Sequence, residues 1–383
     1  MSPPPLKKNK KRSSLTAGVE PPQEDSIEPP SLSLTSLPDE IIFNCLTRVP
    51  GCYYQNLRSV SKTLRSLVNS PELHRLRSFL PNKPKGSVYI LFHVDKTPLY
   101  FWFTLRETEK TSTTTTKIEY RLVPYSTPIR SKFMYRSCTI ALGPEIFFVG
   151  GYIKPSTKLW ILNTRSGDLT KGPNMNVART CEAVVESIDG KVYVMGGCDD
   201  DDIQVEVFDP NSREWTVGES PKKKLQPMRR LRASVNGKVY MVKGEKIVVY
   251  DPSKGQRFKK VKMPSGGGRH GGGLFYMCAV ADVLYCYYFT HGLMGFDAKL
   301  KVWRRVVGLE KLGVAIFHNA ATVEYDGKLA IFWHGSSKKD IRCVLIMLDL
   351  IGDVIRGTIE WCGTVAIMPY NYSFYRCFAC SED

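Results

Sequence analysis

The stretch DGKVYVMGGCDDDDIQVEVFDPNSREW, residues 189–215, carries the pattern that decides the fold. One apolar run ends at a glycine pair, a second ends at Asp209-Pro210, and Trp215 follows six residues after Asp209. Short runs of β-branched and aromatic residues, bounded by Gly, Pro and Asp, are typical of β-strands joined by turns. The stretch therefore predicts consecutive strands, with the aromatic ring of Trp215 supplying buried area on an outer strand.

This pattern recurs along the chain. Five apolar runs end at residues 151, 197, 244, 288 and 333, so they are 46, 47, 44 and 45 residues apart. A second apolar run follows each of them and ends in a turn, with the turn residues Asn163, Asp209, Asp251, Asp297 and Asp349. A period near 45 residues with about four strands per unit indicates a β-propeller, in which each blade buries its faces against its neighbours.

The glycine pair, the Tyr or Phe before Asp-Pro and the later Trp resemble kelch repeats. This resemblance covers about residues 131–370 and is clearest in the second unit, whereas the fourth and fifth units lack the glycine pair. It implies an all-β kelch-type β-propeller over residues 86–380. Five units are readable, and residues 86–125 predict a sixth, atypical blade, giving about six blades. Residues 372–378 are the candidate closing segment, because closure pairs strands from opposite ends of the domain.

Residues 31–80 form a separate, small all-α unit. Ser36 can cap a helix, Pro38 fits its first turn, and Asp39 and Glu40 place negative charge at the positive end of the helix dipole. Apolar residues recur at helical spacing before and after Pro50. A unit this small, without disulfides or metal, buries little apolar surface alone, so we expect some of its apolar residues to face a partner.

The run LPDEII at residues 37–42, with Val49-Pro50 and VSKTLRSL at residues 60–67, resembles an F-box, the module that ties substrate receptors to the Skp-type adaptor of cullin ubiquitin ligases. The sequence departs from that pattern at Cys45, where a branched aliphatic residue is usual, and at Leu64, where Trp or Phe is favoured. The residues to which the resemblance assigns adaptor binding are Leu37, Pro38, Ile41, Ile42, Leu46, Val49, Pro50, Leu57, Val60 and Leu64.

An F-box followed by kelch repeats is similar to the plant family of F-box/kelch-repeat proteins. The family resemblance implies a non-catalytic substrate-recognition subunit of an SCF-type cullin-RING E3 ubiquitin ligase. Its partners would be the Skp-type adaptor, through it the cullin and RING protein, and a protein substrate bound by the propeller for ubiquitination. Two other functions remain open, namely a metal-dependent kelch-propeller enzyme and a scaffold or cytoskeletal binding protein.

The formal net charge is +17, and most of it lies after residue 80. It favours an acidic or phosphorylated protein substrate, with diffuse solubilising charge as the alternative. Nucleic acid is disfavoured, because no recognition helix, finger or RNA-binding signature accompanies the charge. Arg136, Arg179 and Arg232 precede inner strands, and by the kelch resemblance they lie near the rim of the central channel, where they could bind such a substrate. Alternatively, they bind loop carbonyls between blades.

The sequence contains no motif that indicates catalysis or a metal site. The six histidines are scattered, and the glycine-rich run at residues 265–273 lacks the ending of a phosphate-binding loop. Cys377 and Cys380 have CxxC spacing, but no second pair or nearby His completes four ligands. We therefore expect no catalytic residue, no metal and no cofactor.

Residues 1–30 are rich in Pro, Lys, Ser and Glu, and predict a disordered basic arm. The run KKNKKR at residues 7–12 resembles a monopartite nuclear localisation signal. No run of about 18 apolar residues appears. The eleven cysteines are scattered and odd in number, as in a reducing compartment. We expect a cytoplasmic and/or nuclear protein without membrane association.

Overall fold

The structure is a computed structural model of residues 1–383. It describes residues 36–49, 53–80, 86–94, 96–97, 99–111, 116–125, 137–152, 154–200, 202–219, 231–243, 246–251, 259–261, 274–288, 291–298, 300–312, 320–337 and 339–381. The predicted arm at residues 1–30, with its basic run, lies outside the described residues. Among those described, no helix is long and apolar enough to cross a membrane.

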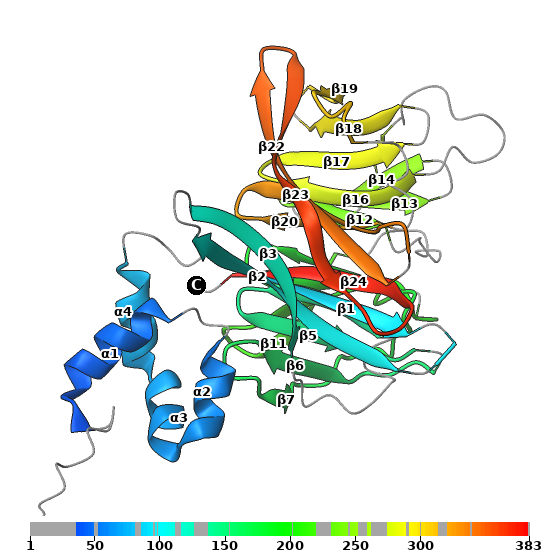
Figure 1. Ribbon diagram of the computed structural model, residues 1–383. Helices are drawn as coiled ribbons and strands as arrows, with labels where there is room; N and C mark the ends of the chain where they lie inside the picture. The colour runs from blue at the N-terminus through cyan, green and yellow to red at the C-terminus, as the bar shows by residue number, and fades with distance from the viewer. Residues whose placement is uncertain are drawn as a thin grey trace, which may run out of the picture.

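The N-terminal unit, blue in Figure 1, consists of short helices. They are α1 (Asp39–Arg48), α2 (Tyr54–Val60), α3 (Lys62–Val68) and α4 (Pro71–Ser78). The hydroxyls of Ser61 and Ser70 cap α3 and α4 by accepting hydrogen bonds from backbone N–H groups. The predicted cap at Ser36 is wrong, because α1 begins after Pro38, which has no side chain able to accept such a bond. Asp39 and Glu40 do lie in the first turn.

A buried polar contact ties these helices together. The hydroxyl of Tyr54 donates to the carbonyl oxygen of Leu46 at 2.7 Å, and it accepts a hydrogen bond from the Arg77 guanidinium at 2.7 Å. The same guanidinium donates to the carbonyl oxygen of Val49 at 2.6 Å, where α1 has ended. Arg77 therefore satisfies the polar groups that the small apolar core would otherwise leave unpaired. That core consists of Ile42, Leu46, Tyr54, Val68 and Leu73.

From Ser87 onward the described residues form six blades of four antiparallel strands. Blade 1 contains β24 (Tyr372–Cys380), β1 (Ser87–Val94), β2 (Tyr100–Thr111) and β3 (Thr116–Tyr125). Blade 2 contains β4 (Cys138–Leu142), β5 (Glu145–Val149), β6 (Leu159–Asn163) and β7 (Leu169–Lys171). Blade 3 contains β8 (Val184–Ile188), β9 (Lys191–Met195), β10 (Val205–Asp209) and β11 (Glu214–Val217).

The remaining strands complete the ring. Blade 4 contains β12 (Arg232–Val235), β13 (Lys238–Lys243), β14 (Lys246–Tyr250) and β15 (Lys259–Val261). Blade 5 contains β16 (Leu274–Val280), β17 (Val283–Tyr288), β18 (Gly292–Asp297) and β19 (Val302–Val307). Blade 6 contains β20 (Ala321–Tyr325), β21 (Lys328–His334), β22 (Asp340–Ile351) and β23 (Val354–Ile367). The fold class expected from the sequence, a kelch-type propeller after a small helical domain, is confirmed.

The ring is closed by the end of the chain. Strand β24 pairs antiparallel with β1, from Val94 opposite Tyr372 to Ser87 opposite Cys380. One edge strand of each blade contacts the corresponding strand of the next blade. The order is β4, β8, β12, β16, β20, β24 and back to β4, so these strands form an inner ring. Apolar clusters lie between neighbouring blades, as where the ring of Phe147 in blade 2 packs against the ring of Phe208 in blade 3. Blade 1 therefore depends on segments from both ends of the propeller (Figure 1).

Blades 5 and 6 are joined in a way that the sequence pattern does not predict. Strands β19 and β23 pair in parallel at Val306 opposite Ile355 and Val307 opposite Arg356, which merges the two blades into one eight-stranded sheet. Ile355 packs so closely over Gly295 that a side chain there would collide with it. The long hairpin of β22 and β23 projects beyond the other strands, at the top of Figure 1.

Candidate functional site

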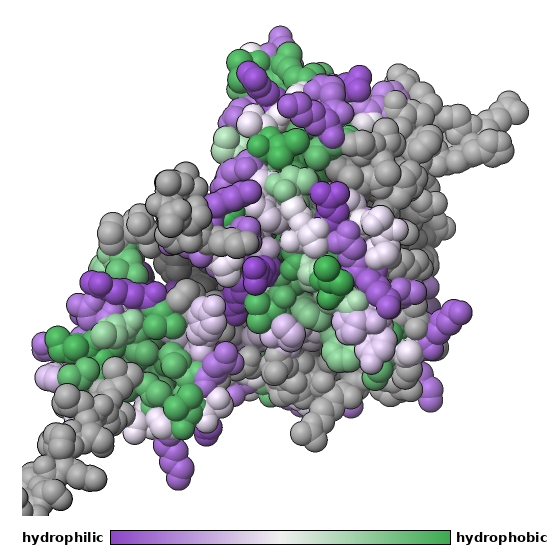
Figure 2. All heavy atoms as spheres, in the orientation of Figure 1, coloured by the Kyte–Doolittle hydropathy of each residue, from purple (hydrophilic) through white to green (hydrophobic). Residues whose placement is uncertain are grey.

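An exposed apolar face lies on the helical unit. The exposed fraction is 38% for Leu37, 49% for Ile41 and 70% for Val60, and Pro38 is exposed as well. Figure 2 shows apolar residues gathered over these helices, at the lower left of the molecule. An exposed group of large apolar side chains on a unit that already has its own core indicates a surface for another protein. Leu37, Pro38, Ile41 and Val60 are thus accessible for the predicted adaptor contact.

The other residues predicted to bind the adaptor have different positions. Ile42, Leu46 and Leu64 are only 2%, 2% and 8% exposed, so their predicted role as contact residues needs correction. Ile42 and Leu46 belong to the helical core, because the inward face of α1 must cover the small interior of the unit. Val49 and Leu57 are half-buried and pack against that core. Pro50 lies outside the described residues.

Of the two residues that depart from the F-box pattern, one is exposed and the other is buried. Cys45 is exposed on α1, whereas Leu64 is buried in α3. The smaller side chain at residue 45 therefore changes the surface of the unit, and Leu64 changes its interior.

The helical unit contacts blades 1 and 2 of the propeller. Arg58 of α2 forms an ion pair with Asp168, in the turn between β6 and β7, with a nitrogen to oxygen distance of 3.2 Å. The Arg106 guanidinium of β2 lies 5.1 Å from the centre of the Tyr53 ring. Burial lowers the pKa of His74 in α4, and the charges of Arg165 in that same turn and of Arg77 lower it further. These contacts hold the helices against one end of the propeller.

Arg179 lies in the interior of the propeller, where a substrate does not reach its side chain. Its side chain is fully buried and forms an ion pair with the equally buried Glu206, with a nitrogen to oxygen distance of 2.8 Å. It also donates to the carbonyl oxygens of Gly196 at 2.8 Å and Ile203 at 3.0 Å. The prediction of substrate contact by Arg179 is therefore wrong, and the alternative, an arginine that binds loop carbonyls, is correct for this residue.

The backbone of Arg179 also takes part in hydrogen bonds. Its carbonyl oxygen accepts hydrogen bonds from the N–H groups of Gly151 and Ser156 in the loop between β5 and β6. Gly150 allows this approach, because its φ is +74° and a Cβ there would lie 2.7 Å from that oxygen. The glycine pair of the repeat thus explains why an arginine can be enclosed at this position.

Arg232 is largely enclosed as well. It forms an ion pair with Glu186 at 3.0 Å, and it donates to the carbonyl oxygens of Val185 in β8 and Thr139 in β4. Burial raises the pKa of Glu186, while the charge of Arg232 opposes that rise. Arg232 of β12 thus links its own strand to β8 and β4, the two preceding strands of the inner ring. Arg136 lies outside the described residues, so its substrate contact stays a prediction.

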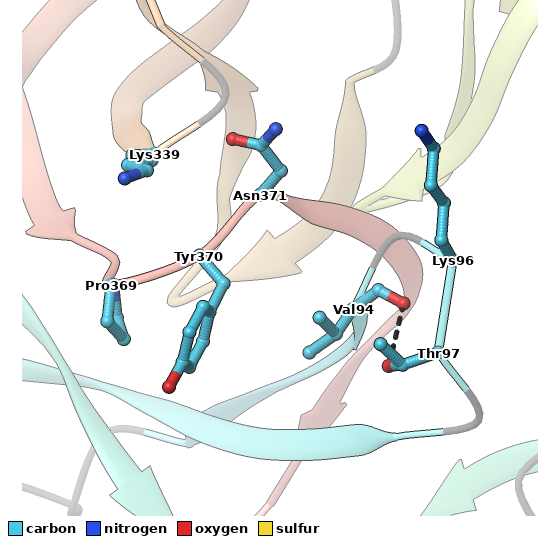
Figure 3. Close-up of a pocket in the computed structure, with 7 residues that line it drawn as sticks. All are labelled: Val94, Lys96, Thr97, Lys339, Pro369, Tyr370 and Asn371. Carbon is cyan, nitrogen blue, oxygen red and sulfur yellow. Dashed lines mark hydrogen bonds between the residues drawn. The ribbon is translucent and has the colours of Figure 1, made fainter.

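The structure contains a pocket that no sequence pattern predicts. Its volume is about 570 Å³, and Figure 3 shows the residues that line it, namely Val94, Lys96, Thr97, Lys339, Pro369, Tyr370 and Asn371. They come from the end of β1 and from the loops between β1 and β2, between β21 and β22, and between β23 and β24. No local pattern connects loops so far apart in sequence, because only ring closure by β24 brings blades 1 and 6 together.

The pocket and the helical unit lie at opposite ends of the same strand. Strand β1 begins at Ser87, just after the helical unit, and ends at Val94 in the pocket wall. A protein held at the helices and another held at the pocket would therefore not compete for one surface.

No metal centre emerges in the part of the chain that the structure describes, since no three His, Cys, Asp or Glu side chains come close enough together there to hold an ion. Cys377 and Cys380 lie in β24, and burial raises the pKa of both thiols. A raised pKa disfavours the thiolate, which is the form that ligates metals and reacts. The described residues thus supply no ligand set for the enzymatic alternative.

Comparisons with known proteins match both parts of the chain. The F-box domain family matches residues 34–76, and the FKB95 Kelch-repeats domain family matches residues 102–366. One F-box/kelch-repeat protein of Arabidopsis thaliana is 51% identical over 258 residues, which covers 65% of this chain and 96% of that protein. Another from the same plant is 36% identical over 384 residues, covering 94% of this chain and 96% of its own length. The chain belongs to the F-box/kelch-repeat protein family.

Proposed function

We propose that this chain is the substrate-recognition subunit of an SCF-type cullin-RING E3 ubiquitin ligase. Its F-box docks a Skp-type adaptor, and through it the cullin and RING protein, while the propeller binds a protein for ubiquitination. The two matched domains support a general role as a substrate adaptor. F-box/kelch-repeat proteins are typically non-catalytic, so the catalytic effect belongs to the assembled ligase.

One observation carries this proposal. The F-box has its own buried core and still leaves Leu37, Ile41 and Val60 exposed, while its residues Arg58 and Tyr53 contact the propeller. A connector needs both surfaces, one for the ligase and one for the receptor. Holding a substrate near the charged conjugating enzyme raises its effective concentration, which by itself accelerates transfer. A scaffold or cytoskeletal role would leave the exposed F-box face without a use.

The test is co-purification with a Skp-type adaptor. Substitution of Leu37 and Ile41 by Ala should weaken adaptor binding by at least about tenfold, because large side chains at the centre of an interface carry most of the binding energy. Since both side chains are exposed, the melting temperature of the propeller should stay unchanged.

A matched control is the double substitution of Val217 and Leu300 by Ala, which also removes two exposed apolar side chains, 55% and 62% exposed, but from the propeller. It should leave adaptor binding intact. Equal adaptor binding by both double variants would refute the assignment of the F-box face.

A further inference from the structure

The pocket between blades 1 and 6 carries two positive charges on opposite sides. Lys96 lies in the loop after β1 and Lys339 in the loop before β22, and Figure 3 shows their side chains on either side of Asn371. Within the described part of the chain, neither ammonium group forms an ion pair. None of the seven lining residues is acidic. The pocket is therefore complementary in charge to an acidic ligand.

Hydrogen bonds join described residues on both lysine-bearing loops. The Thr97 hydroxyl donates to the carbonyl oxygen of Val94 at 3.1 Å and accepts from the N–H of Leu99 at 3.2 Å. The carbonyl oxygen of Lys339 accepts from the N–H of Met368 at 2.7 Å. A ligand that binds here thus meets residues that already have hydrogen-bond partners, which lowers the entropic cost of binding.

Exposed apolar side chains also lie near the pocket. Tyr370 is 61% exposed and Leu99 51% exposed, on the two loops that face each other across the pocket. Ile367 is 82% exposed and pairs with Asp340, next to Lys339. One carboxylate oxygen of Asp340 is buried, and Asp340 does not line the pocket. Exposed aromatic and aliphatic side chains around a concave site are typical of protein recognition.

We propose that this pocket binds an extended acidic segment of a protein, with one aliphatic or aromatic side chain of the segment against Tyr370 and carboxylates toward Lys96 and Lys339. The proposal rests on the proposed function in one respect, namely that the segment belongs to the protein to be ubiquitinated. It assigns recognition to this pocket and not to the arginines for which the sequence left a substrate role open.

The experiment selects short random peptides displayed on phage against the full chain. Enriched peptides are synthesised with a fluorescent label, and their binding is measured by fluorescence polarisation. We expect the enriched sequences to combine Asp or Glu with a large apolar residue. Substitution of Lys96 and Lys339 by Glu should weaken their binding by about tenfold or more, because repulsion replaces attraction at both ends of the segment. Tyr370→Ala should weaken it as well.

The control is the substitution of Lys171 and Lys260 by Glu, which changes the net charge equally but on the exposed outer strands β7 and β15. This control variant should bind the peptides with an affinity within about twofold of that of the unsubstituted chain, because charges beyond the Debye length of about 10 Å are screened. Enrichment of basic or uncharged peptides, no enrichment, or equal weakening by both double variants would overturn the proposal.

Adaptor co-purification, measured on the same variants, separates this proposal from the proposed function. Acidic peptides that bind through Lys96 and Lys339 to a chain that captures no adaptor would uphold the pocket and refute the ligase role. Adaptor capture without selection of acidic peptides would uphold the ligase role and refute the proposal for the pocket.

Discussion

At the scale of single residues, Arg179 shows how one side-chain type serves two roles that the sequence does not separate. A guanidinium near a propeller channel can bind an acidic ligand or the carbonyls of neighbouring loops. Here Glu206 and the carbonyl oxygens of Gly196 and Ile203 use its donors, and no part of the side chain is exposed. Arg179 therefore fixes the junction between blades 2 and 3.

Replacement of Arg179 by Ala should lower the free energy of unfolding by about 3–5 kcal/mol, the usual cost of leaving one partner of a buried ion pair uncompensated. Glu206 would remain buried without its cation. Thermal or urea unfolding of the purified chain measures the effect.

Arg213→Ala is the matched control, because Arg213 forms an ion pair with Glu145 at 3.1 Å but its side chain is 49% exposed. Exposed pairs contribute about 0–1 kcal/mol. A loss of similar size in both variants would contradict the structural role of Arg179.

At the scale of elements, the charge of Arg165 in the turn after β6 acts on His74 in α4 of the F-box. His74 of α4 is partly buried there, and its pKa is lowered from the usual value of 6.5 by burial and by the charges of Arg165 and Arg77. The folded state therefore takes up a proton on His74 less readily than the unfolded state does.

It follows that the stability which neutral His74 contributes is fully present above pH 6.5 and is lost as the pH falls through that value toward the lowered pKa. We expect the melting temperature of the chain to fall between about pH 7.5 and about pH 5.5, and His74→Gln, which cannot titrate, to reduce that fall. Differential scanning fluorimetry across this range tests it. An identical pH profile for both chains would contradict the role of His74.

At the scale of the whole molecule, the propeller is one closed ring and not a stack of independent blades. Blade 1 takes three strands from its start and β24 from the end of the chain. Each blade buries its apolar faces only against neighbours, so one missing strand exposes two neighbouring faces.

A chain truncated after residue 371 should accordingly lose cooperative unfolding and aggregate. Without β24 the edge of β1 has no partner, and apolar residues such as Ile90 and Phe92 lose cover. Circular dichroism melting and gel filtration report the change. Removal of residues 381–383 alone, which lie after β24, should preserve both properties. A monomeric, cooperatively melting chain without β24 would refute the closure argument.

Much of this architecture was predictable from local pattern. The repeat near 45 residues, the glycine pairs and the turn acids depend on neighbours in sequence, so they indicate strands, turns and a propeller without knowledge of contacts. The helical spacing and the LPDEII run likewise indicated the F-box, and the closing segment followed from the need to leave no open edge.

Tertiary structure alone decided which of the predicted site residues are accessible. The sequence predicted Ile42, Leu46 and Leu64 as adaptor contacts, but burial depends on which helix face closes over the core. It left open whether Arg179 binds a substrate or loop carbonyls, because the loops that enclose it come from two different blades. Lys96 and Lys339 meet only because β24 closes the ring. The period of a repeat is a local property of the chain, whereas exposure and convergence are properties of contacts between distant segments.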